Sequence, residues 1–180
     1  MALCDYLITA DIKGYDCANP AVKGAESMGL LLNRSDVTVS ISNFTATPVL
    51  KCGGKTSYKV YQSGKQPWNG SQQEMVEGTY VNTLTNTVQF VILKQDNVTA
   101  EEIFALANGE FIAVVPDKQG NYQVYGAEAG LKCSAAVREL YNDDTLSGWL
   151  ITLTEEGATR SLFCTSTTFN TLQNTTTPCP

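Results

Sequence analysis

Three pairs of adjacent acidic residues are the carboxylates in this chain that could act together in catalysis. They are Glu101-Glu102, Asp143-Asp144 and Glu155-Glu156. A glycosidase needs two carboxylates that face each other across a cleft. We expect the first pair to lie in the opening turn of a helix, where acids complement the helix dipole, and the other two to lie in solvated turns. We therefore assign no catalytic carboxylate.

The six cysteines are a second possible source of chemistry, as metal ligands, nucleophiles or disulfide partners. They lie far apart in the sequence and include no Cys-x-x-Cys pair, which disfavours a zinc knuckle. The amino-terminal sequence has neither the basic start nor the apolar run of a secretory signal, and no segment reaches the roughly 20 apolar residues that span a bilayer. We expect a soluble protein made in the cytoplasm, with free buried thiols at Cys4, Cys17, Cys52, Cys133, Cys164 and Cys179.

Histidine is absent from the sequence, which excludes Ser-His-Asp and Cys-His nucleophilic sites and every metal site that uses His. The segment Gly53-Gly54-Lys55-Thr56 ends like a phosphate-binding loop, but Val49 stands where that motif requires its first glycine. We interpret it as a turn that contains a lysine. The sequence therefore predicts no enzyme, no cofactor and no metal site.

The charge of the chain limits its partners. It has 12 basic and 18 acidic residues, and its net charge is −6. Tight contacts with nucleic-acid phosphates require clustered Lys and Arg. We expect no surface that grips DNA, although DNA could pass nearby without being held.

Residues 97–131 contain the clearest signals for secondary structure, a helix and a β-hairpin, and we expect the other strands and loops to be attached to them. Thr99 can cap a helix through its hydroxyl while Glu102 reaches back to the free amides, and Asn108-Gly109 supplies a left-handed stop. The wholly apolar run 111–115 predicts a strand covered on both sides. Residues 116–120 then turn the chain into a returning strand over 122–126, which completes a β-hairpin.

Other segments predict further strands. We expect a half-buried strand at 37–42, two strands at 80–84 and 87–93 joined by Thr85-Asn86, and a final hairpin of 148–153 and 161–164 around residues 155–158. Residues 132–144 predict either a helical turn or a strand with a bulge. The sequence predicts one domain over 1–180, mainly β with one short helix, built as a β-sandwich or β-barrel.

Two polar segments are expected outside this framework. Residues 43–78 predict a long polar insertion or arm, and residues 165–180 predict a carboxy-terminal tail. Trp68, within the insertion, could fold back on its own domain or insert into a pocket of a partner. Unanchored arms and strand edges favour assembly with other copies over catalysis.

Several short motifs carry a family resemblance. The chain resembles ring and tail-tube-like virion proteins of crAss-like tailed bacteriophages in Cys17-Ala18-Asn19-Pro20, Val22-Lys23-Gly24, Leu32-Asn33-Arg34-Ser35-Asp36, Tyr122-Gln123-Val124-Tyr125-Gly126 and Gly130-Leu131. The resemblance implies a β-sandwich or β-barrel with a flanking helix that stacks as rings, commonly of twelve copies, around the DNA exit channel.

This resemblance implies a structural role in the virion tail or neck, after assembly in the host cytoplasm. The implied partners are copies of the chain, adjacent ring, portal or tail proteins, and DNA or cargo protein that passes through the lumen without tight binding. The family offers no catalytic residues to transfer. The alternative function is a carbohydrate- or ligand-binding module that uses Trp68, Trp149, Tyr58 and Tyr61 as stacking surfaces.

Overall fold

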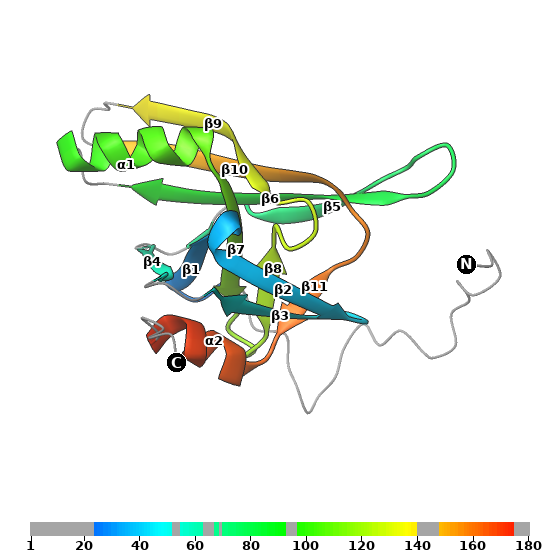
Figure 1. Ribbon diagram of the computed structural model, residues 1–180. Coiled ribbons are helices and arrows are strands. Elements are labelled where there is room, and N and C mark those ends of the chain that lie inside the picture. The colour runs from blue at the N-terminus through cyan, green and yellow to red at the C-terminus, as the bar shows by residue number, and fades with distance from the viewer. Residues whose placement is uncertain are drawn as a thin grey trace.

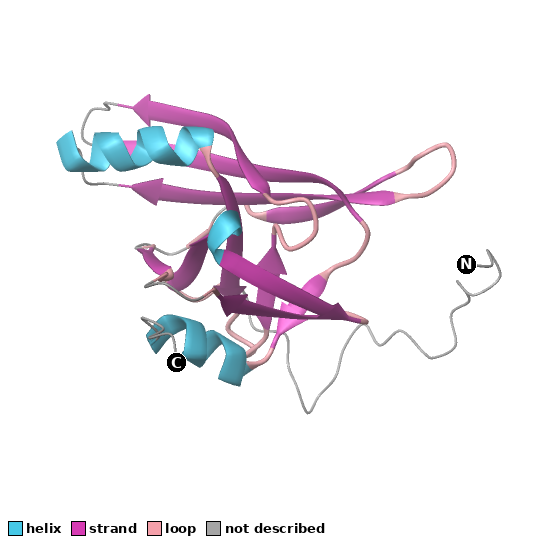
Figure 2. Cartoon of the chain, viewed as in Figure 1, coloured by secondary structure: helices cyan, strands magenta, loops and turns pink. Residues whose placement is uncertain are grey.

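The computed structural model describes residues 24–51, 55–62, 67–68, 70–92, 97–139 and 148–174, and these form a mainly β protein (Figures 1 and 2). The strands are β1 (Met28–Asn33), β2 (Val37–Ser42), β3 (Thr45–Leu50), β4 (Tyr58–Tyr61), β5 (Gln72–Val76), β6 (Thr83–Ile92), β7 (Glu110–Pro116), β8 (Tyr122–Tyr125), β9 (Leu131–Glu139), β10 (Gly148–Ala158) and β11 (Leu162–Cys164). The helices are α1 (Asn97–Asn108) and α2 (Ser166–Asn174), with a 3₁₀ turn η1 (Arg34–Asp36). The predicted mainly β class is confirmed, with a second helix that was not expected.

The strands form one mixed sheet in the order β2-β3-β11-β8-β7-β9-β10-β6-β5, and β1 branches from β7 and carries β4. The β11–β3 pair is parallel and the other pairs are antiparallel. Within the described ranges β2 and β5 do not meet, so the sheet is open and has free edges.

Strand β7 lies at the centre of the fold, between two hydrophobic cores. Ile112 and Val114 face one core, while Phe111, Ala113 and Val115 face the other, because successive side chains of a strand point to opposite faces. All five are buried. The predicted strand with both faces covered is confirmed, and so is the β7–β8 hairpin, whose turn is held by Asp117 Oδ1 accepting hydrogen bonds from the Gln119 and Asn121 amides.

The first core lies between β1, β2, β3, β8 and α2. Helix α2 contributes Phe169, whose ring centroid lies 4.8 Å from that of Tyr122, and Leu172. Thr165 caps this helix, because its Oγ1 accepts a hydrogen bond from the Thr168 amide at 3.2 Å. The prediction of a tail over 165–180 is therefore wrong for residues 166–174; the rest of that segment lies outside the described residues.

The second core lies between α1, β6, β9 and β10, and Ile103 is the buried side chain that α1 contributes. Helix α1 is confirmed, but it begins at Asn97, so Thr99 lies inside its first turn rather than before it. The helix ends at Asn108 as predicted. Neither Asn108 nor Gly109 is left-handed; instead Asn108 Nδ2 donates to Phe104 O at 2.9 Å. Gly109 is required for close packing, because a Cβ there would lie 2.4 Å from Phe111 Cζ.

The prediction of a long insertion over 43–78 is wrong. Residues 45–50 form β3, which pairs along its whole length with β2, and residues 58–61 and 72–76 form β4 and β5. In β3 the buried residues Ala46, Pro48 and Leu50 alternate with exposed Thr45, Thr47 and Val49. Polar outward side chains of this kind gave the segment the composition of a loop. The strand predicted at 37–42 is confirmed as β2.

Three further strands or strand pairs differ from, or decide between, the sequence predictions. Residues 83–92 form the single strand β6, which passes straight through Thr85-Asn86. Residues 131–139 form β9, so the strand reading was correct for them, and a bulge interrupts its pairing with β10 between Thr152 and Leu153. The predicted hairpin of 148–153 with 161–164 is wrong, because β10 continues to Ala158 and β11 pairs with β3 and β8.

Candidate functional site

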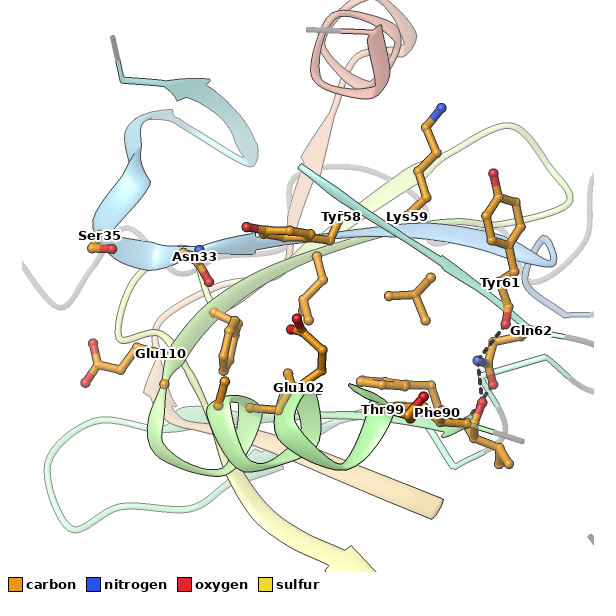
Figure 3. Close-up of a pocket in the computed structure, with 18 residues that line it drawn as sticks. Asn33, Ser35, Tyr58, Lys59, Tyr61, Gln62, Phe90, Thr99, Glu102 and Glu110 are labelled. Carbon is orange, nitrogen blue, oxygen red and sulfur yellow. Dashed lines mark hydrogen bonds between the residues drawn. The ribbon is translucent and has the colours of Figure 1, made fainter. Parts of the chain in front are cut away.

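A half-open cleft of about 800 Å³ lies between α1 and β4 (Figure 3). Its floor is apolar and comes from β1, β6 and β7, with Leu31, Phe90 and Phe111 among the lining residues. Leu106 of α1 and Val60 of β4 form apolar parts of its walls. We call this site the α1–β4 cleft.

Strand β4 owes its position to two sets of contacts. It pairs with β1 from Met28↔Tyr61 to Leu31↔Tyr58. The buried Gln62, directly after the strand, ties this segment to β6: its Nε2 donates to Val91 O at 3.0 Å, and its Oε1 accepts from the Val91 amide at 2.8 Å. The side chain of Gln62 thus replaces a main-chain strand partner and holds β4 over the cleft.

The alternation of β4 places only part of its side chains in the cleft. Tyr58 extends across the cleft, whereas Lys59 and Tyr61 point away from it (Figure 3). On the opposite wall, Glu102 of α1 points into the cleft. Within the described part of the chain its carboxylate has no hydrogen-bond or ion-pair partner. The cleft can therefore accept an apolar or aromatic group that also carries a hydrogen-bond donor.

The four aromatic residues proposed as a stacking surface do not come together. Trp68 is only 4 % exposed and packs edge-to-face on Phe90 at 5.8 Å between ring centroids, and its Nε1 donates to Glu26 O at 3.1 Å. It therefore folds back on its own domain, and the alternative of a partner pocket is wrong. Trp149 packs against the second core under the Arg138 guanidinium, 5.7 Å away, and does not line the cleft. Only Tyr58 and Tyr61 line it, and only Tyr58 faces inward.

The acidic pairs have a different arrangement from the one predicted. Because α1 begins at Asn97, Glu101 and Glu102 lie beyond its first turn. Asp143-Asp144 lies outside the described residues. Glu156 is exposed, but Glu155 is only 2 % exposed and lies in β10, so the prediction of a solvated turn is wrong for Glu155.

The Glu155 carboxylate is held by donors from two segments. Its Oε2 accepts from Asn86 Nδ2 and from the Gly126 amide, each at 2.7 Å. Its Oε1 accepts from the amides of Glu128 at 3.2 Å and Ala129 at 2.8 Å. Four donors satisfy both oxygens, so this acid fixes the connection between β8 and β9 rather than facing a substrate.

The remaining predicted groups are structural or undescribed. Gly53 and Gly54 lie outside the described residues, while Lys55 forms an ion pair with Asp36 at 2.9 Å, and this contact lowers the pKa of Asp36. Cys133 and Cys164 are free thiols, and burial raises the pKa of Cys164 to about 12. The other cysteines lie outside the described residues. No three His, Cys, Asp or Glu side chains gather to hold a metal in the part of the chain that the structure describes.

Sequence reasoning missed an exposed apolar tip on the β5–β6 hairpin, which projects from the sheet (Figure 1). Met75 is 69 % exposed and Tyr80 is 91 % exposed, and Val76 and Val81 are also exposed. We call these four side chains the hairpin tip. The signal in the sequence was the pair of apolar dipeptides Met75-Val76 and Tyr80-Val81 on either side of Glu77-Gly78-Thr79.

A scan against protein-family models finds no match, and searches of curated proteins and of solved structures find no similar protein. Among the described helices none is long and apolar enough to cross a bilayer.

Proposed function

We propose that this chain is a structural virion protein that forms an oligomeric ring in the tail or neck of a tailed bacteriophage, around the channel through which DNA or cargo protein leaves. Neighbouring copies, adjacent rings, and portal or tail proteins would be its partners. The motif resemblance described above supports this proposal. The mainly β class with a helix against each core agrees with the β fold and flanking helix that the resemblance implies, although the described strands form one open mixed sheet rather than a sandwich or barrel.

The observation that carries the proposal is the hairpin tip. It presents four large apolar side chains to solvent on a projecting hairpin, with Tyr80 91 % exposed. Contiguous exposed apolar groups on a soluble protein mark sites of protein–protein contact, because water covers them unfavourably. A ring subunit needs such a contact surface, whereas a monomeric enzyme or carrier does not.

Free strand edges give further support. Among the described strands, β2 and β5 end the sheet and β4 ends its branch. Unpaired main-chain donors and acceptors along an edge can pair with another chain. Assembly would cover these edges.

The acidic balance of the chain suits a channel. A net charge of −6 disfavours tight contact with DNA phosphates, so a lumen of this kind would let DNA slide. We expect weak or undetectable binding to duplex DNA at low salt. Tight binding under those conditions would argue against a lumen-facing role.

The test of the proposed function is sedimentation velocity of the purified chain over a wide concentration series. The expected result is a discrete species much larger than the monomer, whose share grows with concentration. A chain that sediments as a monomer or dimer throughout the series would overturn the proposal.

A second candidate function is a ligand-binding module, and the α1–β4 cleft favours it, since Tyr58 and Glu102 face each other across an apolar floor. A binding module would be a monomer or dimer and would bind an added sugar or small aromatic compound through this cleft. Isothermal titration calorimetry of an oligosaccharide panel against the native chain and a Tyr58→Ala variant tests it. A member of the panel must bind the native chain and must not bind the variant.

A further inference from the structure

We propose that the hairpin tip of one copy inserts into the α1–β4 cleft of the next copy. This inference rests on the proposed function, because it names the contact through which the ring would close. The occupant of the cleft is a second copy of this chain, because the shape, polarity and position of the two surfaces match.

The hairpin tip has the shape of an insert. β5 and β6 pair from Gln72↔Thr87 to Val76↔Thr83, so the strands are rigid up to the turn and hold the tip away from the sheet. Tyr80 is the most exposed of the large apolar side chains in the described residues. Tyr gives a large contact area at little cost in conformational entropy, which is why it is enriched in the energetic centres of interfaces.

The cleft has matching polarity. Its floor is apolar, and its one inward-facing carboxylate, Glu102, has no partner among the described residues. The Tyr80 hydroxyl is a hydrogen-bond donor at the end of an apolar ring, which is the chemistry that such a cleft accepts. At the outer edge of the cleft, the exposed Lys59 can attract Glu77, which lies in the turn of the hairpin.

The two surfaces lie at opposite ends of the molecule. In Figure 1, α1 and β4 are on the left and the turn of the β5–β6 hairpin is on the far right. A contact between two different, oppositely placed surfaces is heterologous, so each copy offers one hairpin and one cleft. Repetition of this contact builds a closed ring when the rotation per copy closes, whereas a symmetric dimer interface would use the same surface twice.

The experiment uses two variants that each lose one half of the contact. Tyr80→Ser combined with Val81→Ser removes the insert, and Ala105→Arg places a long charged side chain in the cleft from an exposed position of α1. Matched controls change other exposed residues. Phe104→Arg alters the neighbouring position of α1, which does not line the cleft, and Phe44→Ser alters the β2–β3 turn. Circular dichroism and thermal unfolding verify that all four variants fold.

Sedimentation velocity of the native chain and of each variant gives the readout. For the two variants that lose one half of the contact, we expect the dissociation constant for self-association to rise about tenfold or more, so that they sediment as monomers. Both controls should assemble like the native chain. The decisive mixture combines the two contact variants. The Ala105→Arg chain still has its hairpin and the Tyr80→Ser/Val81→Ser chain still has its cleft, so together they should form a one-to-one dimer and no larger species.

The outcomes separate this inference from the proposed function. If the native chain assembles and the contact variants assemble equally well, or if their mixture forms no dimer, the hairpin–cleft contact is wrong and the ring proposal stands. If the native chain and the mixture both remain monomeric, both proposals are overturned. If the mixture forms the dimer while the native chain forms only a dimer or an open-ended series of species, the contact stands and the closed ring is overturned.

Discussion

Asn86 donates a hydrogen bond from its side-chain nitrogen to the Glu155 carboxylate across 2.7 Å, and this buried pair joins β6 to β10. The same carboxylate accepts main-chain amides from Gly126, Glu128 and Ala129. One acidic side chain therefore fixes two neighbouring strands and the connection that leads from β8 to β9. This arrangement adds a side-chain link to the main-chain pairing of β6 and β10, and β6 is the strand from which the β5–β6 hairpin projects.

The first prediction concerns Glu155→Gln. The new amide nitrogen would face donors that now meet an acceptor, so buried hydrogen bonds would be lost and the free energy of unfolding should fall by about 3 kcal/mol. Urea unfolding at neutral pH measures it. Glu156→Gln is the matched control, since Glu156 is exposed, and should change stability by less than about 0.5 kcal/mol. Equal effects of the two substitutions would show that the carboxylate does not hold this region.

The second prediction concerns Trp68→Ala. Trp68 is 4 % exposed, packs on Phe90 and donates to Glu26 O, so truncation leaves a cavity and should lower the free energy of unfolding by about 3–5 kcal/mol. Tyr61→Ala, at an exposed position, should cost less than about 1 kcal/mol. Native stability in the Trp68→Ala variant, together with a loss of assembly, would instead place Trp68 at an interface.

The third prediction compares two glycines with left-handed backbones. Gly126 has a φ of 81°, and a Cβ there would lie 2.4 Å from Phe111 O, which is backbone and cannot move aside. Gly120 has a φ of 85° but open space around it. Gly120→Ala should therefore cost about 1–2 kcal/mol, the strain of the left-handed conformation alone. Gly126→Ala should cost clearly more, and thermal unfolding of both variants would refute this if their melting temperatures were the same.

The fourth prediction concerns alkaline pH. Burial, and then the charge of Asp117, raises the pKa of Tyr125 from 10.0 to about 12. The unfolded chain therefore loses this proton first, so the contribution of Tyr125 to stability is fully present below pH 10 and is lost as pH rises toward 12. Tyr125→Phe should make the fall in the free energy of unfolding above pH 10 less steep. A profile unaffected by Tyr125→Phe would contradict the assignment.

Local signals in the sequence predicted the centre of the fold. The apolar run 111–115 and the turn at 116–120 specify their own conformation, because their turn geometry and hydrogen bonds involve near neighbours. The structure contains β7, the β7–β8 hairpin and α1 where the sequence placed them.

Long-range pairing accounts for what the sequence did not reveal. β3 is a strand because β2 lies beside it, although its outward Thr residues give it the composition of a loop. α2 is ordered because Phe169 and Leu172 reach the first core, and the Thr165 cap is a local signal of its start. Glu155-Glu156-Gly157 has the composition of a turn, but the donors around Glu155 come from residues about 30 and about 70 positions away.

The candidate site was the least predictable part. Tyr58 lines the α1–β4 cleft, but the cleft itself forms only when β4 pairs with β1 and Gln62 binds the main chain of β6. Trp68 and Trp149 were proposed as stacking residues, but Trp68 belongs to the second core and Trp149 packs against that core. Which aromatic side chains face solvent depends on tertiary packing, which a composition of 9 % aromatic residues does not specify.

The central claim is that this chain acts by assembling with its own copies, and electron microscopy of the purified protein in negative stain tests it most directly. The account predicts class averages of closed rings with one rotational symmetry and an open central channel. A uniform field of single small particles at concentrations where the protein remains folded would contradict it.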